Sequence, residues 1–422
     1  MLDIKFIREN KELIALASKK KKIDFDIDKL ILADDKRKNL LLKVEEKRAD
    51  QKVANNKIVT STSEEREVIL EQMKILKTDL EKDEGELKEI MKEWHALMLQ
   101  VPNIPDISVP EGESDEDNQE YKKWGDIPSF SFKPKAHYEI MTDLGLADFE
   151  RGAKVSGFRG YFLKNDGVRL VWALERFVED MFLKKGFNPM IVPSMLRRES
   201  FIGTGYLPQS EEDLYKTQDG DYLAGTAEVS TMGYYMDEVL EKKMLPLKFF
   251  SYSQCFRREA GSHGKDEKGV FRIHEFFKYE QVVLCEANHD ESVRIHEELT
   301  KNSEEILEAL KLPYRVVVNC GADLGLGQVK KYDIETWMPS ENRYRETHSS
   351  SYFHDFQTRR LNIRYRDEDG KLRYVHSLNN TALAMPRILC QLLENYQNPD
   401  GSVRVPDVLI PYMNGEDMIR KK

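Results

Sequence analysis

The sequence has few cysteines and no long apolar run. Its four cysteines form no CxxC pair, and none lies at zinc-ligand spacing with a histidine. No apolar stretch approaches the roughly 20 residues that a transmembrane helix requires, and charged residues begin near the N-terminus, in MLDIKFIREN. We therefore expect reduced thiols, no zinc, haem or flavin, no membrane association and a cytoplasmic location.

Positive charge is also in deficit. The chain has 65 Lys and Arg against 75 Asp and Glu, which gives a formal net charge of -10. Net charge controls solubility and long-range steering, so this balance argues against a protein that coats DNA or RNA nonspecifically. A local basic surface can still bind a polyanion, so a shape-specific RNA contact is not excluded. With 422 residues, the chain is long enough for two domains.

Glycine and proline are almost absent from the first hundred residues. From Ile69 to Leu97, apolar residues recur in alternating steps of four and three, and only Asp83 interrupts them. This heptad pattern predicts a coiled coil. An earlier helix, residues 27–58, has a thinner seam: Ile27, Leu30, Leu41, Val44 and Ile58. With Ser63 as the expected cap of the second helix, the pattern predicts an antiparallel hairpin over about 27–98, roughly 45 Å long.

Two interpretations of this hairpin stay open. It could be a dimerisation coiled coil, or the basic face of its first helix could bind a phosphate backbone. A run of charges is more often only a solvated face. The candidate nucleic-acid contacts are Lys36, Arg37, Lys43, Lys47 and Arg48.

The composition changes after residue 100. The acidic stretch 101–125 is typical of a linker, and aromatic residues, glycine and proline become more frequent over 126–422. Short β-like runs at 248–252 and 314–318 alternate with helical patterns. We predict an α+β domain built on an antiparallel sheet with flanking helices, preceded by the helical hairpin domain of residues 1–100.

Residues 256–280 combine charge with an aromatic side chain. Two β-like arms flank a glycine-containing loop. Strand alternation predicts that Arg257 and Glu259 share one face of the first arm, and that Arg272 and Phe276 share one face of the second. A guanidinium group fits phosphate and carboxylate oxygens, and an aromatic ring can stack on a base. The pattern indicates a nucleotide site that lacks both a Walker loop and GxGxxG. The alternative is a surface hairpin with paired charges.

A second segment near the C-terminus leads from small polar residues into an apolar helix that contains Arg387. A buried arginine needs an anionic partner, because burying it alone costs much free energy. That partner could belong to a ligand or to a structural salt bridge.

Together these segments resemble the three motifs of class II aminoacyl-tRNA synthetases. The helix and strand of residues 168–193, which end at Pro193, resemble motif 1. The charged hairpin, about 250–281, resembles motif 2, and the Arg387 helix, about 376–396, resembles motif 3. The three occur in the family's order.

Further blocks are similar to seryl-tRNA synthetases in particular. The GTAE sequence at 225–228 resembles their serine-site loop, and YRETHS at 344–349 resembles a segment that contacts ATP. The N-terminal hairpin is similar to their tRNA-binding arm. The resemblance covers essentially the whole chain.

This resemblance implies roles for individual residues. Arg257 would bind the ATP α-phosphate and the serine carboxylate, and Glu259 the adenine amino group. Phe276 and Arg387 would cover the two faces of adenine, and Arg387 would also reach the γ-phosphate. Arg257, Glu259 and Arg387 would thus be the catalytic residues. The implied ATP-binding residues are Arg257, Arg258, Glu259, Arg272, Ile273, Phe276, Glu346, Thr347, His348, Ser349 and Arg387. The implied serine-binding residues are Thr226, Ala227, Glu228, Glu280, Asn379 and Thr381. Glu346 and Ser349 would hold Mg²⁺ with ATP, and His348 could instead be a structural histidine.

The implied activity is that of a serine–tRNA ligase. Serine would be activated with ATP and then transferred to tRNA(Ser), with tRNA(Sec) as a second candidate substrate. Motif 1 implies a homodimer. Two alternatives stay open: a catalytically inactive relative, and a related ligase that loads an amino acid onto a carrier protein.

Overall fold

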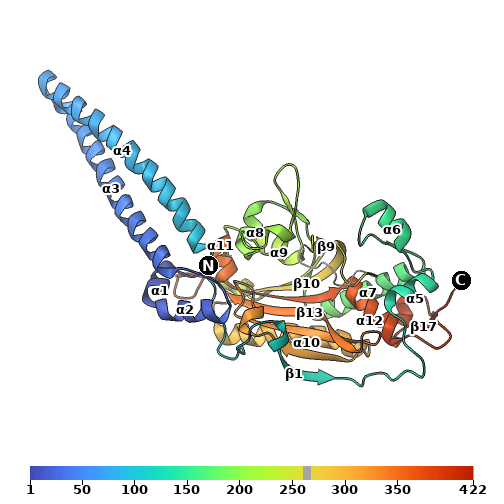
Figure 1. Cartoon of the computed structure of the whole chain (residues 1–422). Coiled ribbons are helices and arrows are strands. Elements are labelled where there is room, and N and C mark those ends of the chain that lie inside the picture. The colour runs from blue at the N-terminus through green and yellow to red at the C-terminus, as the bar shows by residue number, and fades with distance from the viewer. Residues whose placement is uncertain (260–267, 422) are drawn as a thin grey trace. The chain divides into compact units, whose positions relative to one another are not determined.

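The computed structural model describes residues 1–259 and 268–421, which form two compact units (Figure 1). The smaller unit comprises Leu2–Lys19 and Ile23–Pro102, and the larger one Met1, Lys20–Lys22 and Asn103–Lys422. No helix among the described residues is long and apolar enough to cross a membrane.

Two long helices form most of the smaller unit. α3 (Ile27–Thr60) and α4 (Ser63–Met98) lie side by side as an antiparallel hairpin after the short helices α1 (Ile4–Glu9) and α2 (Lys11–Lys20) (Figure 1). The cap of α4 is Thr62, not the predicted Ser63, which is the first helical residue. The Thr62 backbone N–H and hydroxyl both donate to the Glu65 carboxylate, at 3.0 and 2.9 Å. This capping pair fixes the start of α4.

The predicted heptad seam of α4 is confirmed. Leu80, Ile90 and Leu97 are buried in it. Asp83, its polar position, forms an ion pair with Lys47 of α3 at 2.8 Å. The exception in the pattern is therefore a cross-helix contact that fixes the register of the hairpin.

The predicted seam of α3 was wrong at Leu41, which is 37% exposed. The buried positions Leu30 and Val44 are two heptads apart, and Arg37 lies midway between them. The Arg37 guanidinium lies over the Trp94 ring of α4, 4.7 Å from its centroid. An arginine thus fills a seam position through a cation–π contact, which an apolar pattern does not reveal.

The larger unit confirms the predicted α+β class. Its eight-stranded sheet has the order β1-β11-β12-β13-β16-β10-β9-β4. Neighbouring strands are antiparallel except β4 and β9, which are parallel. The strands are β1 (Gln119–Trp124), β4 (Asn188–Ile191), β9 (Leu247–Phe256), β10 (Glu275–Cys285), β11 (Tyr314–Val318), β12 (Lys330–Met338), β13 (Arg343–His354) and β16 (His376–Ala384).

Helices cover both faces of this sheet, and α8 and α9 lie on the opposite side from α10 (Figure 1). The helices are α5 (His137–Asp143), α6 (Phe149–Ser156), α7 (Asp166–Lys184), α8 (Arg198–Thr204), α9 (Ala227–Gly233), α10 (His289–Ala309), α11 (Phe356–Leu361) and α12 (Met385–Asn395). Short 3₁₀ helices are η1 (Asp115–Asp117), η2 (Glu211–Asp213), η3 (Lys242–Met244), η4 (Gly321–Asp323) and η5 (Asp407–Met413). Two small sheets have two strands each: β2 (Ala147–Asp148) with β3 (Phe162–Leu163), and β17 (Val403–Arg404) with β18 (Met418–Ile419). One three-stranded sheet has the order β5 (Met195–Leu196), β7 (Tyr222–Leu223), β6 (Tyr215–Lys216). Another has the order β15 (Leu372–Tyr374), β14 (Arg364–Arg366), β8 (Val239–Glu241).

Alternation along the strands assigns one face to the core. Phe250 of β9 stacks on Phe182 of α7, with 4.5 Å between ring centroids. Gln281 of β10 donates to the Leu299 carbonyl of α10 at 3.1 Å. Its neighbour Glu280 points to the opposite face, where polar side chains gather.

The segment 101–125 was predicted as a linker, and the structure corrects this. It contains β1, which pairs with β11 and forms one edge of the sheet. The sequence QEYKKW has four polar or charged residues out of six, and most of its side chains are exposed, so the alternation that marks a strand is missing. Asn103, at the start of this segment, is buried and donates to the carbonyls of Gly327 and Phe353.

The two strands predicted around the glycine-containing loop are confirmed, but they are shorter than expected. β9 ends at Phe256 and β10 begins at Glu275, so Arg257, Glu259 and Arg272 lie outside both strands. The prediction that alternation places these residues on common faces was therefore wrong. Glu259 even has a positive φ of 55°. Gly261 and Gly264 lie outside the described residues.

Candidate active site

Three buried polar side chains meet where β10 faces the start of α9. Lys278 and Glu280, two residues apart on one face of β10, form an ion pair. The Lys278 ammonium donates to the Thr226 hydroxyl at 2.8 Å, and that hydroxyl lies 3.4 Å from the Glu280 carboxylate. Thr226 is also the N-cap of α9, so its position is fixed by the helix. The cluster offers a carboxylate and a hydroxyl to a small polar ligand.

β16 brings two further predicted serine-site residues to β10. Thr381 is the register partner of Glu280, and Asn379 is the partner of Val282. Both side chains are buried. Ala227, also predicted, has no exposed surface.

Glu228, in the first turn of α9, is a second buried carboxylate. The amide of Gln357 donates to one carboxylate oxygen at 2.6 Å, and the Tyr206 hydroxyl donates to the other at 3.2 Å. Burial raises the pKa of Glu228 to about 7, against the lowering effect of Gln357; Glu280 raises this pKa further and Lys278 lowers it. At neutral pH this group is poised to gain charge when a cation arrives.

Arg257 follows β9 directly and is half-buried. Its backbone N–H donates to the His274 carbonyl at 2.9 Å, which holds the two sides of the loop together. Its guanidinium contacts the Gly225 carbonyl at 3.4 Å and lies 5.5 Å from the centroid of the Phe276 ring. The structure therefore brings Arg257, predicted to bind phosphate, next to Phe276, predicted to stack on a base.

The neighbouring charged residues separate into two groups. Glu259 and Arg272 form an ion pair across the base of the loop. Arg258 is exposed, and its guanidinium donates to the Glu212 carbonyl at 3.1 Å. Its role in binding ATP stays a prediction, and its partner in this structure lies in η2.

Glu346 of β13 and Arg387 of α12 meet on the polar face of the sheet. The Arg387 guanidinium lies 3.1 Å from the Glu346 carboxylate and donates to the Glu346 carbonyl at 3.0 Å. The Arg387 guanidinium also lies over the ring of Phe271, with its Cζ atom 5.2 Å from the ring centroid. Burial opposes ionisation of Glu346, but Arg387, Lys331 and Arg257 hold its pKa at about 2. This carboxylate is ionised at neutral pH.

Ser349 is the register partner of Asp333 on β12 and is half-buried. Asp333 is paired with Lys331 at 2.9 Å and accepts a hydrogen bond from Asn319 at 2.7 Å. Burial raises the pKa of Asp333 to about 7, against Lys331. The Asp333 carboxylate is thus already engaged by Lys331 and Asn319, and binding of Mg²⁺ by Glu346 and Ser349 stays a prediction.

Three of the predicted ATP-binding residues are buried. Ile273 is 3% exposed and belongs to the main apolar core. Thr347 is 1% exposed, and its hydroxyl is 2.8 Å from that of Thr336. Burial lowers the pKa of His348, also 1% exposed, to about 3, so its ring is neutral. A contact of these side chains with ATP stays a prediction.

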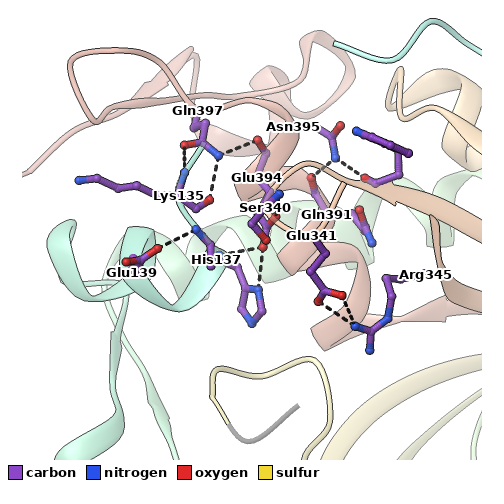
Figure 2. A network of polar contacts seen from close by, with 12 residues as sticks. Lys135, His137, Glu139, Ser340, Glu341, Arg345, Gln391, Glu394, Asn395 and Gln397 are labelled. Atoms are coloured by element: carbon purple, nitrogen blue, oxygen red, sulfur yellow. Dashed lines mark hydrogen bonds and ion pairs between the residues drawn. The ribbon is translucent and has the colours of Figure 1, made fainter. Parts of the chain in front are cut away.

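A buried ion pair supports the second side of the loop. The ring of His137, the first residue of α5, lies 2.9 Å from the Glu394 carboxylate, which also accepts from the backbone N–H groups of His137 and Ser340 (Figure 2). Burial opposes protonation of His137, but Cys390 and Glu394 raise its pKa to about 10. Gly269 packs so closely on this ring that a Cβ there would come within 2.1 Å of it. A side chain at Gly269 would therefore displace the segment that leads to Arg272.

The predicted nucleic-acid contacts of α3 differ in their surroundings. Lys36 and Lys43 are exposed. Lys47 pairs with Asp83, Arg48 pairs with Glu84 at 2.7 Å, and Arg37 is held by Trp94 and by Asp34. The last three thus already stabilise the hairpin itself.

Sequence reasoning missed three residues of the polar cluster: Lys278, Tyr206 and Gln357. Lys278 could have been found, because it lies two residues before Glu280 on a strand and therefore shares its face. Tyr206 and Gln357 carried no local signal, because they are 22 and 129 positions from Glu228 in the chain.

Comparison with known proteins agrees with this arrangement. Residues 1–105 match the seryl-tRNA synthetase N-terminal domain, and residues 214–396 match the tRNA synthetase class II core domain (G, H, P, S and T). A serine–tRNA ligase of Deinococcus radiodurans is 46% identical over 99% of both chains. The chain belongs to the seryl-tRNA synthetase family. A second member, the serine–tRNA ligase of Treponema denticola, is 42% identical over 98% of both chains.

Solved structures of seryl-tRNA synthetases have the same fold. That of Pyrococcus horikoshii, crystallised with ATP, superimposes with a TM-score of 0.90 at 38% identity over the full length of both chains. The cytoplasmic serine–tRNA ligase of Naegleria fowleri, crystallised with AMP, gives 0.87 at 33% identity, over 100% of this chain and 99% of that one.

Proposed function

We propose that the chain catalyses the reaction of its family, ATP-dependent ligation of L-serine to tRNA(Ser). The observation that carries this proposal is the presence of two kinds of charge in one polar site, where the sheet meets α9, α12 and the end of β9. Glu228 and Glu280 are carboxylates suited to an ammonium group and a hydroxyl. Arg257 and Arg387 are guanidinium groups suited to phosphate oxygens.

In the first step, a serine carboxylate oxygen attacks the α-phosphorus of ATP. The new P–O bond forms seryl-adenylate, the bond to the bridging oxygen breaks, and pyrophosphate leaves. Negative charge on the phosphoryl oxygens calls for positioning and fixed positive charge. Arg257 supplies positive charge near the α-phosphate, and Arg387 supplies it near the γ-phosphate. Phe276 stacks on adenine, and Glu259 contacts the adenine amino group.

In the second step, a hydroxyl of the terminal ribose of tRNA attacks the seryl carbonyl carbon. The ester bond to tRNA forms, the bond between the carbonyl carbon and the phosphate oxygen of the adenylate breaks, and AMP leaves. Serine is selected over alanine because a substrate without the hydroxyl leaves the Glu280 carboxylate without that partner; such sites discriminate by up to about 10⁴-fold.

Mg²⁺ accompanies ATP in this proposal, and the residues present fit it. The ion prefers a few hard oxygen ligands and retains much of its water. Glu346 provides an ionised carboxylate and Ser349 a hydroxyl beside it on β13. When bound, the ion would neutralise phosphate charge.

The test is serine-dependent exchange of pyrophosphate into ATP, run in parallel with serine, alanine, threonine and glycine. We expect exchange with serine that requires Mg²⁺. An enzyme that gives no exchange with any amino acid would contradict the proposal and favour the inactive relative.

The proposal predicts a pH-dependent affinity for serine. The pKa of Glu228 is about 7 in the free protein. A rise from pH 6 to pH 8 therefore ionises this carboxylate, and the substrate ammonium binds the ionised form. We expect the KM for serine to fall about tenfold over this range, whereas the KM for ATP stays nearly constant. Initial rates of exchange measure both, and Glu228→Gln should remove the pH dependence.

We further propose a homodimer formed through α7 and β4. β4 is the edge strand opposite β1, and Ile191 on it is 87% exposed; Trp172 on α7 is 61% exposed. Exposed apolar groups at an open edge are typical of an interface. We expect light scattering to give the dimer mass, and Ile191→Arg to shift it to the monomer mass. A monomeric parent protein would contradict this assignment.

The hairpin of residues 27–98 is proposed as the arm that binds tRNA(Ser), and tRNA(Sec) is the second candidate. Its exposed lysines Lys36 and Lys43 are the first contacts to test, because no hydrogen bond or ion pair is seen for them among the described residues. We place the protein in the cytoplasm, where reduced cysteines and the translation substrates are available.

A further inference from the structure

Gln357 of α11 is buried and connects three parts of the larger unit. Its amide nitrogen donates to the Glu228 carboxylate at 2.6 Å and to the Thr204 carbonyl at 3.3 Å. Its amide oxygen accepts a hydrogen bond from the Ser377 hydroxyl at 2.7 Å. The Thr204 carbonyl is an acceptor only, so the amide nitrogen must face it and the orientation of the amide is determined by chemistry.

Through its hydrogen bond, Gln357 determines the orientation of the Glu228 carboxylate and stabilises its ionised form. Tyr206 holds one carboxylate oxygen and Gln357 the other. A buried carboxylate is stable as an anion only if donors compensate for the lost water, and a donor to a charged group is worth more than one to a neutral group. The other charged groups that act on this cluster are Lys278 and Glu280, with Arg257 acting on Tyr206.

We propose that Gln357 is a positioning residue for serine binding, which orients the Glu228 carboxylate toward the ammonium group of the substrate. The inference rests on the proposed function, in which Glu228 belongs to the serine site. Ser377, which fixes Gln357, lies on β16 two residues before Asn379. Gln357 therefore also links the α9 side of the serine site to the strand that completes it.

The test replaces Gln357 with methionine, which keeps the length of the side chain and removes both polar atoms. Because a hydrogen bond to a charged group is lost, the KM for serine in pyrophosphate exchange should rise about tenfold to a hundredfold. The KM for ATP and the kcat should stay within about twofold, because Gln357 makes no contact with Arg257, Phe276 or Arg387 among the described residues.

Thr358→Val is the matched control. Thr358 is the next residue of α11, is equally buried, and its hydroxyl donates to the Val375 carbonyl at 2.6 Å. This variant loses a buried hydrogen bond of α11 but leaves Glu228 untouched, whereas Gln357→Met loses three. We expect both variants to lower the melting temperature, Gln357→Met by more, and only Gln357→Met to change the KM for serine.

A pH profile separates positioning from a structural defect. Without its amide donor, Glu228 should ionise at higher pH than in the parent protein. The ratio of the serine KM values, Gln357→Met over parent, should therefore decrease as the pH rises from 7 to 9.

The outcomes are distinguishable. A parent enzyme without serine-dependent exchange would sink the proposed function itself. An active parent with a normal serine KM in Gln357→Met would overturn only the positioning role. Equal increases in the KM values for serine and ATP, or a constant ratio across pH, would also overturn it and assign Gln357 a purely structural role.

Discussion

Arg257→Ala and Arg387→Ala are each expected to abolish serine-dependent exchange of pyrophosphate into ATP. Removing one preorganised donor to a developing oxyanion typically costs about 10²–10³-fold in rate. Here each arginine also provides charge that a neutral side chain cannot replace. Arg387 is held by Glu346 at 3.1 Å and lies over Phe271, so its position is set before any substrate binds. The measurement is the exchange rate at saturating serine and ATP.

Two further variants make this experiment specific. Arg387→Lys keeps the positive charge but loses the planar fork, so we expect an intermediate rate. Arg294→Ala removes an exposed arginine of α10 that pairs with Glu291 and Glu298, and it should leave the rate unchanged. Exchange at a near-normal rate in either alanine variant would remove that arginine from the proposed mechanism.

Shortening the hairpin is expected to separate the two steps of the reaction. Deleting residues 45–86 and closing the chain with a short Gly-Ser turn removes the part beyond Val44, including the Lys47–Asp83 contact. Serine-dependent exchange should survive, because its residues lie in the larger unit. Charging of tRNA(Ser) should fall by at least about a hundredfold, since loss of even two charge-assisted contacts accounts for that much. Initial rates of aminoacylation measure the effect.

The controls test which surface of the hairpin acts. The double substitution Lys36→Glu and Lys43→Glu on α3 should lower the rate of tRNA charging. It should also make that rate less sensitive to salt concentration. Lys74→Glu with Lys92→Glu reverses two exposed charges of α4, where both lysines pair with neighbouring glutamates. This second pair should have a smaller effect. Normal charging by the shortened protein would make the hairpin only a structural coiled coil.

Much of the fold was predictable because periodicity is a local property. The heptads of α4 were correctly predicted because one helix face is buried. The strands at 248–252 and 314–318 were correctly predicted because consecutive apolar side chains are buried on both of their faces. Predictions failed where side chains do not follow that rule. β1 is polar because it lies at the edge of the sheet, and Arg37 fills a seam position through its contact with Trp94.

The candidate site was predictable only in part. A resemblance to known motifs pointed to Arg257, Glu280 and Arg387. It could not show that Arg258 turns toward η2 or that His348 is enclosed, because both depend on neighbours from other elements.

The sequence by itself determined the helical hairpin, the antiparallel sheet and the residue types suited to phosphate and carboxylate groups. Only the tertiary structure decided which of these residues act together. Tyr206 and Gln357 reach Glu228 across 22 and 129 positions of the chain, and Lys278 pairs with Glu280 beside Thr226. The physical reason is that a buried charge must find its partners in space. Strand order and helix packing set these distances, and no local pattern records them.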